Sequence, residues 1–396
     1  MNSDRKMDLL KRKTFLPFAV PSIGDEEIAD VVSCLRSGWL TTGIRARQFE
    51  EAFASYVGGS HAVAVNSCTA ALHLALESVG VAQGDEVITT PMTFGATAAV
   101  IEHLKARPVF VDCDPLTFNI NARAVEQSVT RKTKAVIPVH FAGQACDMDT
   151  ISEIAGKNNF RVIEDAAHAV PTTYKGRMIG SIGDVTCFSF YATKNITTGE
   201  GGMAVTHNPD YAERMRLMSL HGMSRDAWKR YTQDGSWSYD ILAPGYKYNM
   251  TDIAAAVGIN QLAKCQSFYE RRMRIAAMYH EAFSAIPEIS PPFAGTHGQH
   301  AWHLFVILLN LEMLKIGRDE FIRELLASNI GVSVHFIPLH LHPYYALRYG
   351  YKPEDFPNAY QAFKRMISLP IYPRMTDADV HDVIEAVTRT VGRFKR

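Results

Sequence analysis

Two polar residues near the middle of the chain have side chains that could hold and activate an organic cofactor. Asp165 ends the apolar run 161–165 (RVIED), and Lys194 follows the β-branched and aromatic run 184–190 (DVTCFSF). A lysine amine forms a Schiff base with an aldehyde, and a buried carboxylate keeps a pyridine nitrogen protonated so that the ring accepts electrons. The pair therefore predicts a pyridoxal phosphate (PLP) site.

The residues around this pair favour the catalytic interpretation over two simpler ones. Most lysines are solvated, and an aspartate after a strand is most often a helix cap. However, Ser189 precedes Lys194 by five residues and supplies a hydroxyl that suits a phosphate. The glycine-rich segment 199–202 also lets the backbone approach a bulky group.

An upstream segment predicts an anion site. Residues 61–65 (HAVAV) predict a strand and residues 70–79 predict a helix, with a short polar turn between them. The free N–H groups and the positive dipole end at the start of a helix suit a phosphate, although Ser67 and Thr69 could simply cap the helix. Phe94, after the next predicted strand, could stack on a flat heterocycle or belong to the core.

These residues need a sheet to bring them together. Short β-rich runs alternate with helical stretches from about residue 23 to residue 261, which predicts an α/β fold with a mainly parallel sheet covered by helices. Ligands bind at the carboxyl ends of the strands in such sheets. A helical break near 265–270 predicts a large PLP-binding domain (14–265) and a smaller C-terminal α/β domain (266–396). The smaller domain is expected to contain strands at 302–310 and 332–336 and helices at 318–328 and 377–391.

The composition narrows the class of protein. The chain has 396 residues, and 41 acidic residues balance 41 lysines and arginines, so neither nucleic acid nor an anionic membrane is expected as a partner. Six scattered cysteines without a CxxC pattern predict reduced thiols. No secretion signal or membrane-spanning run is evident, so we expect a cytoplasmic enzyme. The lack of a G-x-G-x-x-G after the first strand, and of a P-loop, argues against nicotinamide and nucleoside triphosphate enzymes.

Six motifs, in one order, resemble those of the DegT/DnrJ/EryC1/StrS sugar aminotransferases. They are NSCTAALHLAL at 66–76, DEVITTPMTFGATA at 85–98, PVHFAGQ at 138–144, IEDAAHA at 163–169, FSFYATKNITTGEGG at 188–202 and GYKYNMTDIAAAVGINQL at 245–262. The resemblance runs from about residue 18 to the C-terminus. It implies the aspartate-aminotransferase (type I PLP) fold and a homodimer with active sites at the subunit interface.

The resemblance also implies a role for each site residue. Lys194 would form the Schiff base and move the proton during turnover, and Asp165 would pair with the pyridine nitrogen. Phe94 would lie against the ring, and His168 would lie near the oxygen of the ring. The phosphate would be held by Cys68, Thr69 and Ser189.

One motif departs from the pattern of the family. Many members read GYNYR where this chain reads GYKYN at 245–249. The asparagine of the family reaches the phosphate of the neighbouring subunit's cofactor. Here Lys247 occupies that place and Asn249 is nearby, so either residue could make the contact.

The implied reaction is PLP-dependent transamination of a nucleotide-linked 4-keto sugar. L-glutamate would be the amino donor, and the products would be a 4-amino sugar nucleotide and 2-oxoglutarate. The segment GWLTTG at 38–43 is similar to that of members that aminate C4, although Gly38 could simply end a helix. The candidate substrate contacts are Trp39, Thr41, Thr42, Arg225 and His335.

Several alternatives remain open at this stage. Arg225 could bind a diphosphate or a carboxylate, or be solvated. The histidines at 335–342 lack a companion cysteine or acid set, so a wall of the sugar pocket is favoured over a metal site and no metal is expected. A sugar C3 or inositol aminotransferase would use the same cofactor residues, and a PLP-dependent sugar dehydratase would have a histidine in place of Lys194. A regulator that only binds the cofactor is a non-enzymatic alternative.

Overall fold

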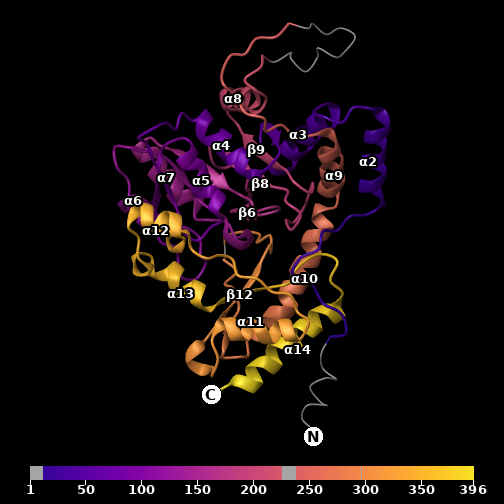
Figure 1. The fold of residues 1–396 in the computed structure, drawn as a ribbon, viewed down its shortest axis with the longest axis vertical. Helices are drawn as coiled ribbons and strands as arrows, with labels where there is room; N and C mark the ends of the chain where they lie inside the picture. Colours follow the sequence, from indigo (N-terminus) through magenta and orange to yellow (C-terminus); the bar gives the residue numbers. More distant parts are fainter. Residues whose placement is uncertain (1–11, 225–237, 296) are drawn as a thin grey trace.

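The computed structural model describes residues 12–224, 238–295 and 297–396, which form a larger and a smaller part (Figure 1). The larger part holds a seven-stranded sheet in the order β1-β9-β8-β5-β4-β2-β3. Strand β9 is antiparallel to both of its neighbours, and the other neighbouring pairs are parallel. The predicted α/β fold with a mainly parallel sheet is therefore confirmed. The strands are β1 (His61–Val65), β2 (Glu86–Thr89), β3 (Arg107–Phe110), β4 (Thr133–Ile137), β5 (Arg161–Asp165), β8 (Val185–Ser189) and β9 (Gly202–Thr206).

Helices cover both faces of this sheet. On one face, α3 (Ile44–Val57), α7 (Met148–Asn158) and α9 (Asp252–Ala263) bury a core that contains Val162. On the other, α4 (Cys68–Ser78), α5 (Gly95–His103) and α8 (Pro209–Ser219) bury a core that contains Ile163. Because successive strand residues point to opposite faces, Glu164 and Asp165 also point to opposite faces. The larger part further includes α2 (Asp25–Ser37), α6 (Ala122–Gln127), η1 (Phe141–Gly143), β6 (Thr173–Tyr174) and β7 (Arg177–Met178).

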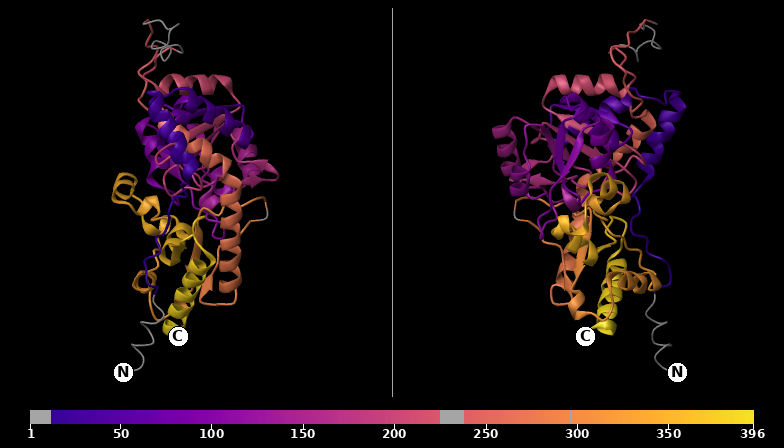
Figure 2. Two further views of the ribbon diagram at one scale, coloured as in Figure 1. Left: turned by 90° about the vertical axis from the view of Figure 1, so that its right-hand side faces the viewer. Right: turned by 60° about the vertical axis from the view of Figure 1, so that its left-hand side comes forward.

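The smaller part is built on an antiparallel sheet with the order β10-β11-β12. A single residue, Lys264, separates helix α10 from α9, and α10 runs from the larger part into the smaller one (Figure 2). Its buried Tyr279 and Phe283 pack with Phe305 of the sheet. The elements here are α10 (Cys265–Phe283), β10 (Ile289–Ser290), β11 (Phe305–Leu309), η3 (Leu311–Met313), α11 (Arg318–Ala327), η4 (Leu339–Leu341), α12 (Pro343–Tyr349), η5 (Pro353–Asp355), α13 (Pro357–Arg365), β12 (Met366–Leu369) and α14 (Asp377–Phe394).

One predicted strand of the smaller part is wrong. Residues 332–336 form no strand; Ser333 alone makes a bridge to Ser368, through main-chain hydrogen bonds of 3.1 and 2.8 Å. The chain then leaves the sheet, because His335 and Phe336 turn to pack with the aromatic rings of Phe18 and Phe141. The third strand is instead β12, which the sequence analysis missed. Within the described ranges, no helix is both long and apolar enough to span a membrane.

Candidate active site

Asp165 is the last residue of β5, and its carboxylate is buried beside α5. Oδ2 accepts the Thr97 hydroxyl at 2.8 Å, and Oδ1 accepts the Ala167 N–H at 3.1 Å. Burial raises the pKa of the carboxyl, and these hydrogen bonds and the charge of Lys194 offset only part of the effect. A buried carboxylate of this kind is stabilised by a cationic N–H partner, which a protonated pyridine nitrogen would provide.

Lys194 lies on the turn after β8, where its main-chain N–H donates to the Tyr191 carbonyl at 2.9 Å. The residue as a whole is partly exposed, whereas its amine is enclosed by protein. Burial lowers the pKa of the amine to about 8, although Cys68 and Asp165 act in the opposite direction. At neutral pH the neutral fraction of this amine is much larger than that of an ordinary lysine, and the neutral amine is a nucleophile toward an aldehyde and an acceptor for protons.

The start of α4 lies against β9 and forms a candidate anion cradle. Ser67 caps the helix through its side chain, so of the two predicted caps it is Ser67, and not Thr69, that has this role. A Cβ atom at Gly202 would lie 2.5 Å from the carbonyl of Ser67 and 2.6 Å from the nitrogen of Cys68, so the close approach requires glycine. Ser189 pairs with Gly202 across the sheet. The predicted phosphate ligands therefore gather at one helix start, which suits an anion.

His168 lies in a stack of rings next to Asp165. Its ring centroid is 4.3 Å from that of His303 and 5.9 Å from that of Phe336, whose plane is inclined by only 14°. Nδ1 accepts the Ala142 N–H at 3.3 Å. Burial lowers the pKa of His168 well below its usual value, and the charge of Lys194 adds to the effect. His168 is therefore neutral with its proton on Nε2, which makes this nitrogen a hydrogen-bond donor.

Two further histidines line this region. The Nδ1 atom of His303 lies 3.1 Å from the amide oxygen of Asn195 and donates to it. His335, a predicted sugar contact, lies with Nδ1 2.9 Å from the Ser368 hydroxyl, and burial lowers its pKa to about 4. Burial also lowers the pKa of His303 well below its usual value, so both rings are neutral at physiological pH. Among the residues that the structure describes, no group of three or more His, Cys, Asp or Glu side chains could hold a metal ion.

Phe94 is not a core residue. It immediately precedes α5, and its side chain is 67% exposed. Its ring centroid lies 6.4 Å from that of Phe336, which in turn stacks on His168. The exposed ring therefore lies on the same side as His168, in a position where it can cover a flat ligand.

The predicted substrate loop and the departing motif form a second cluster. The amide nitrogen of Asn249 donates to the Thr42 hydroxyl at 2.6 Å, and the Lys247 amine donates to the amide oxygen of Asn249. The Trp39 indole donates to the Thr42 carbonyl at 3.2 Å, and the Thr41 carbonyl accepts the N–H of Asp252. Among the described residues, no hydrogen bond joins this cluster to Asp165, Lys194 or His168.

One predicted site residue falls outside the described structure, and some residues of the site were not predicted from the sequence. Arg225, a predicted substrate contact, falls outside the described residues. Neither the place of Thr97 and Phe336 in the site nor a role for His303 was predicted from the sequence. Thr97 was foreseeable, because it follows the carboxyl end of β2, where ligands bind in such sheets. Its hydroxyl lies 2.8 Å from that of Thr93. Phe336 carried no comparable signal, since its place depends on how the smaller part packs.

The fold and the site together define a class of protein. A lysine with a lowered amine pKa, a buried carboxylate and a glycine-lined helix start at the carboxyl ends of a mainly parallel sheet fit the aldehyde, ring nitrogen and phosphate of PLP. The chain is a PLP-dependent aminotransferase with the aspartate-aminotransferase (type I) fold. The sequence profile of the DegT/DnrJ/EryC1/StrS aminotransferase family matches residues 21–388, and the chain belongs to that family.

Individual relatives agree with this assignment. The chain is 55% identical over 378 residues to the spore coat polysaccharide biosynthesis protein SpsC of Bacillus subtilis, covering 95% of this chain and 97% of SpsC. The putative sugar aminotransferase Spr1654 from Streptococcus pneumoniae in its PMP-form is 37% identical, with a TM-score of 0.90 over 96% of this chain and 99% of that one. Helicobacter pylori PseC, an aminotransferase involved in the biosynthesis of pseudoaminic acid, is 28% identical, with a TM-score of 0.89 over 96% of this chain and 100% of PseC.

Proposed function

We propose that the enzyme transfers the amino group of L-glutamate to a nucleotide-linked 4-keto sugar. The products are then a 4-amino sugar nucleotide and 2-oxoglutarate. The transfer rests on one observation, the position of Lys194 after β8, which pairs with β5 and its buried Asp165. Burial there lowers the pKa of the Lys194 amine to about 8. The choice of a sugar is supported by the names of SpsC and PseC, which place those relatives in polysaccharide and pseudoaminic acid biosynthesis.

Each polar residue of the site has a proposed role. PLP supplies an aldehyde that exchanges amino groups and a ring that accepts electrons. Nζ of Lys194 takes a proton from the amino donor and returns it during the second half of the reaction. The Asp165 carboxylate keeps the ring nitrogen protonated, and the Nε2–H group of His168 donates a hydrogen bond to the ring oxygen. Phe94 covers the ring, and the phosphate is bound by Cys68, Thr69 and Ser189.

The 4-keto position is supported by the resemblance of the segment GWLTTG at 38–43 to that of family members that aminate C4. The residues of this segment are held in place by Asn249 and by the Asp252 carboxylate, which accepts the Gly43 N–H at 2.7 Å and the Ala46 N–H at 3.0 Å. The segment is therefore an ordered surface and not merely a linker after α2. We propose that Trp39, Thr41 and Thr42 contact the sugar nucleotide. The same proposal extends to Arg225 and His335.

We further propose that two copies of the chain share their active sites and work in the cytoplasm. Leu40, Ile44, Ile241 and Leu242 are large apolar residues that are exposed in the single chain, and a second copy would bury such a surface. Lys247 is linked through Asn249 to Thr42, which lies between Leu40 and Ile44 in the sequence, and we propose that it reaches the partner's phosphate. All six cysteines are free thiols, as in a reducing compartment.

The visible absorption spectrum of the purified enzyme tests the proposal. L-glutamate should convert the bound cofactor to its amino form, and one keto sugar nucleotide should convert it back. Paired substrates with the same nucleotide and a ketone at C4 or C3 distinguish the two acceptor classes. Recovery with only the C3 ketone would favour the sugar C3 alternative, and release of a deoxy sugar without a new amine would identify a dehydratase.

A further inference from the structure

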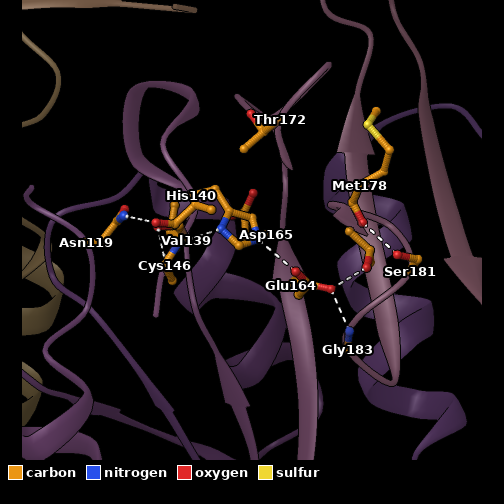
Figure 3. A network of polar contacts seen from close by, with 12 residues as sticks. Asn119, Val139, His140, Cys146, Glu164, Asp165, Thr172, Met178, Ser181 and Gly183 are labelled. Carbon is orange, nitrogen blue, oxygen red and sulfur yellow. Dashed lines mark hydrogen bonds and ion pairs between the residues drawn. The ribbon is translucent and has the colours of Figure 1, made fainter. Parts of the chain in front are cut away.

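Glu164 is a buried carboxylate directly behind Asp165 in β5. It is fully inaccessible to solvent and points to the opposite face of the sheet. Three donors surround it, namely His140 Nε2 at 2.9 Å, the Gly183 N–H at 2.8 Å and the Thr186 hydroxyl at 2.7 Å. Burial raises the pKa of Glu164, but these hydrogen bonds outweigh burial and lower it overall. Glu164 is therefore ionised and joins three separate segments of the chain (Figure 3).

His140 is the partner that links Glu164 to the rest of the site. Burial lowers its pKa, whereas Cys146 and Glu164 raise it to about 10. The Cys146 N–H points at Nδ1 at 3.1 Å, so Nε2 is the nitrogen that carries a proton toward Glu164. The His140 main chain also bonds to that of Asp165, since its N–H donates to the Asp165 carbonyl at 3.1 Å. His140 thus holds both the side chain of Glu164 and the backbone of Asp165.

The turn after His140 contacts the other polar group of the proposed cofactor site. In η1, the Ala142 N–H donates to Nδ1 of His168 at 3.3 Å. The Ala142 carbonyl accepts the His303 N–H at 3.0 Å. Because the Ala142 N–H fixes which nitrogen of His168 carries the proton, a shift of this turn would change the donor that faces the ring oxygen.

From these contacts we infer that His140 and Glu164 form a positioning pair for the cofactor site. Through the backbone of β5 the pair sets the place of Asp165, and through η1 it sets the tautomer of His168. Neither side chain touches the cofactor, because both lie on the face of the sheet opposite to Asp165. The inference rests on the roles proposed above for Asp165 and His168, and it is independent of which sugar is the acceptor.

Four variants separate hydrogen bonding from simple packing. His140→Gln keeps an N–H donor close to the position of Nε2, whereas His140→Leu keeps much of the volume without a donor. Glu164→Gln removes the charge. Glu288→Gln is the matched control, because Glu288 is also buried and ion-paired, to Lys395 at 2.9 Å, but in the smaller part of the molecule.

The readouts are the pH titration of the visible absorption of bound PLP, the PLP dissociation constant, and kcat and KM for L-glutamate. His140→Leu and Glu164→Gln should move the midpoint of the titration and lower kcat by ~10- to 100-fold, with KM changed by no more than about twofold. His140→Gln should restore most of both properties. The inference is overturned if these variants titrate like the wild type and lose no more kcat than Glu288→Gln.

Two additional variants keep the test decisive. If Glu164→Gln does not fold, Thr186→Val removes one donor to Glu164, and an unmoved midpoint in that variant would overturn the inference. Asp165→Asn tests the underlying role: an unchanged titration there would remove Asp165 from the site and the inference with it. A change in Asp165→Asn without a change in the variants of His140 and Glu164 would overturn the positioning pair alone.

Discussion

Burial lowers the pKa of the Lys194 amine and raises the pKa of the Asp165 carboxyl, and both shifts favour the neutral form. In the lysine this increases the fraction of free amine near neutral pH, which is the form that attacks an aldehyde. In the aspartate it makes an ionised carboxylate costly unless a cation lies beside it. The cofactor-free protein is thus prepared to react with PLP and is stabilised when it does.

The pH dependence of PLP binding follows from the lysine. Below pH 8 the amine is mainly protonated and unreactive, so the rate of cofactor attachment to the cofactor-free protein should rise with pH and level off above a midpoint near 8. The Asp165 charge raises the pKa of Lys194, so Asp165→Asn should move this midpoint to lower pH. Stopped-flow absorbance at a series of pH values measures both. A midpoint near that of ordinary lysine would show that the amine is not enclosed.

Removal of Lys194 should abolish turnover and leave the fold intact. Lys194→Ala should lower kcat by at least ~10³-fold, because the covalent attachment and the proton transfer both depend on Nζ. Lys175→Ala changes an exposed, ion-paired lysine and serves as the control. Visible absorption, activity and circular dichroism provide the readouts. Turnover comparable to the control would exclude Lys194 as the catalytic base.

Asp165→Asn should separate stability from activity. The pKa of Asp165 is higher in the folded protein than in the unfolded chain, so its ionised form destabilises the cofactor-free fold at pH values above the unfolded-state pKa. The variant without cofactor should therefore melt at the same temperature as the wild type or a few degrees higher, while turnover falls steeply. Calorimetry at pH 7 checks the sign. A marked fall in melting temperature would mean that the carboxylate is stabilised by groups other than the cofactor.

At the scale of elements, we expect phosphate binding to depend on the close contact between β9 and the start of α4. Gly202→Ala would place Cβ against the backbone of Ser67 and Cys68. We expect a loss of ~1–3 kcal/mol in the free energy of unfolding and weaker PLP binding. Gly156→Ala is a suitable control, because Gly156 lies in α7 with open space around it and the change should be neutral or stabilising. Denaturant unfolding and PLP titration measure the two effects.

A Gly202→Ala protein that binds PLP as tightly as the wild type would contradict the anion cradle. Equal losses in the free energy of unfolding for Gly202→Ala and Gly156→Ala would show instead that the contact with α4 does not require glycine at position 202.

The elements that local pattern determines were predicted, and those that depend on packing were not. The runs 61–65, 161–165 and 184–190 became strands of the larger sheet because their apolar, β-branched residues suit a strand that is covered on both faces. In contrast, residues 332–336 (VSVHF) also contain β-branched and aromatic residues but contribute only the bridge of Ser333, since His335 and Phe336 pack toward the site. The strand β12 and the ring stack on His168 likewise depend on contacts between distant segments.

At the scale of the whole molecule, the sheet places Asp165 and Lys194 of one chain at the carboxyl ends of its parallel strands. The second cluster, Thr42 with Asn249 and Lys247, has no hydrogen bond to Asp165, Lys194 or His168 in the part of the chain that the structure describes. We therefore propose that this cluster binds the cofactor phosphate of a second copy of the chain. The division into domains at residue 265 also stays a prediction, although α9 and α10 do separate at Lys264.

Subunit mixing tests whether two copies share each site. In a shared site, Lys194→Ala damages the site of its own subunit, whereas the double variant Lys247→Ala, Asn249→Ala damages the site of the partner. A mixed dimer then has one site with both defects and one intact site. Co-refolding equal amounts of the two proteins should restore activity to about a quarter of the wild-type value, because half of the dimers are mixed and each has one good site.

Lys194→Ala mixed with Asp165→Asn is the control, since both changes affect a subunit's own site and no intact site can form. Recovery in the first mixture but not in the second would establish that Lys247 and Asn249 act across the interface. The absence of recovery in both, with dimers verified by mass, would assign the Thr42, Lys247 and Asn249 cluster to its own subunit.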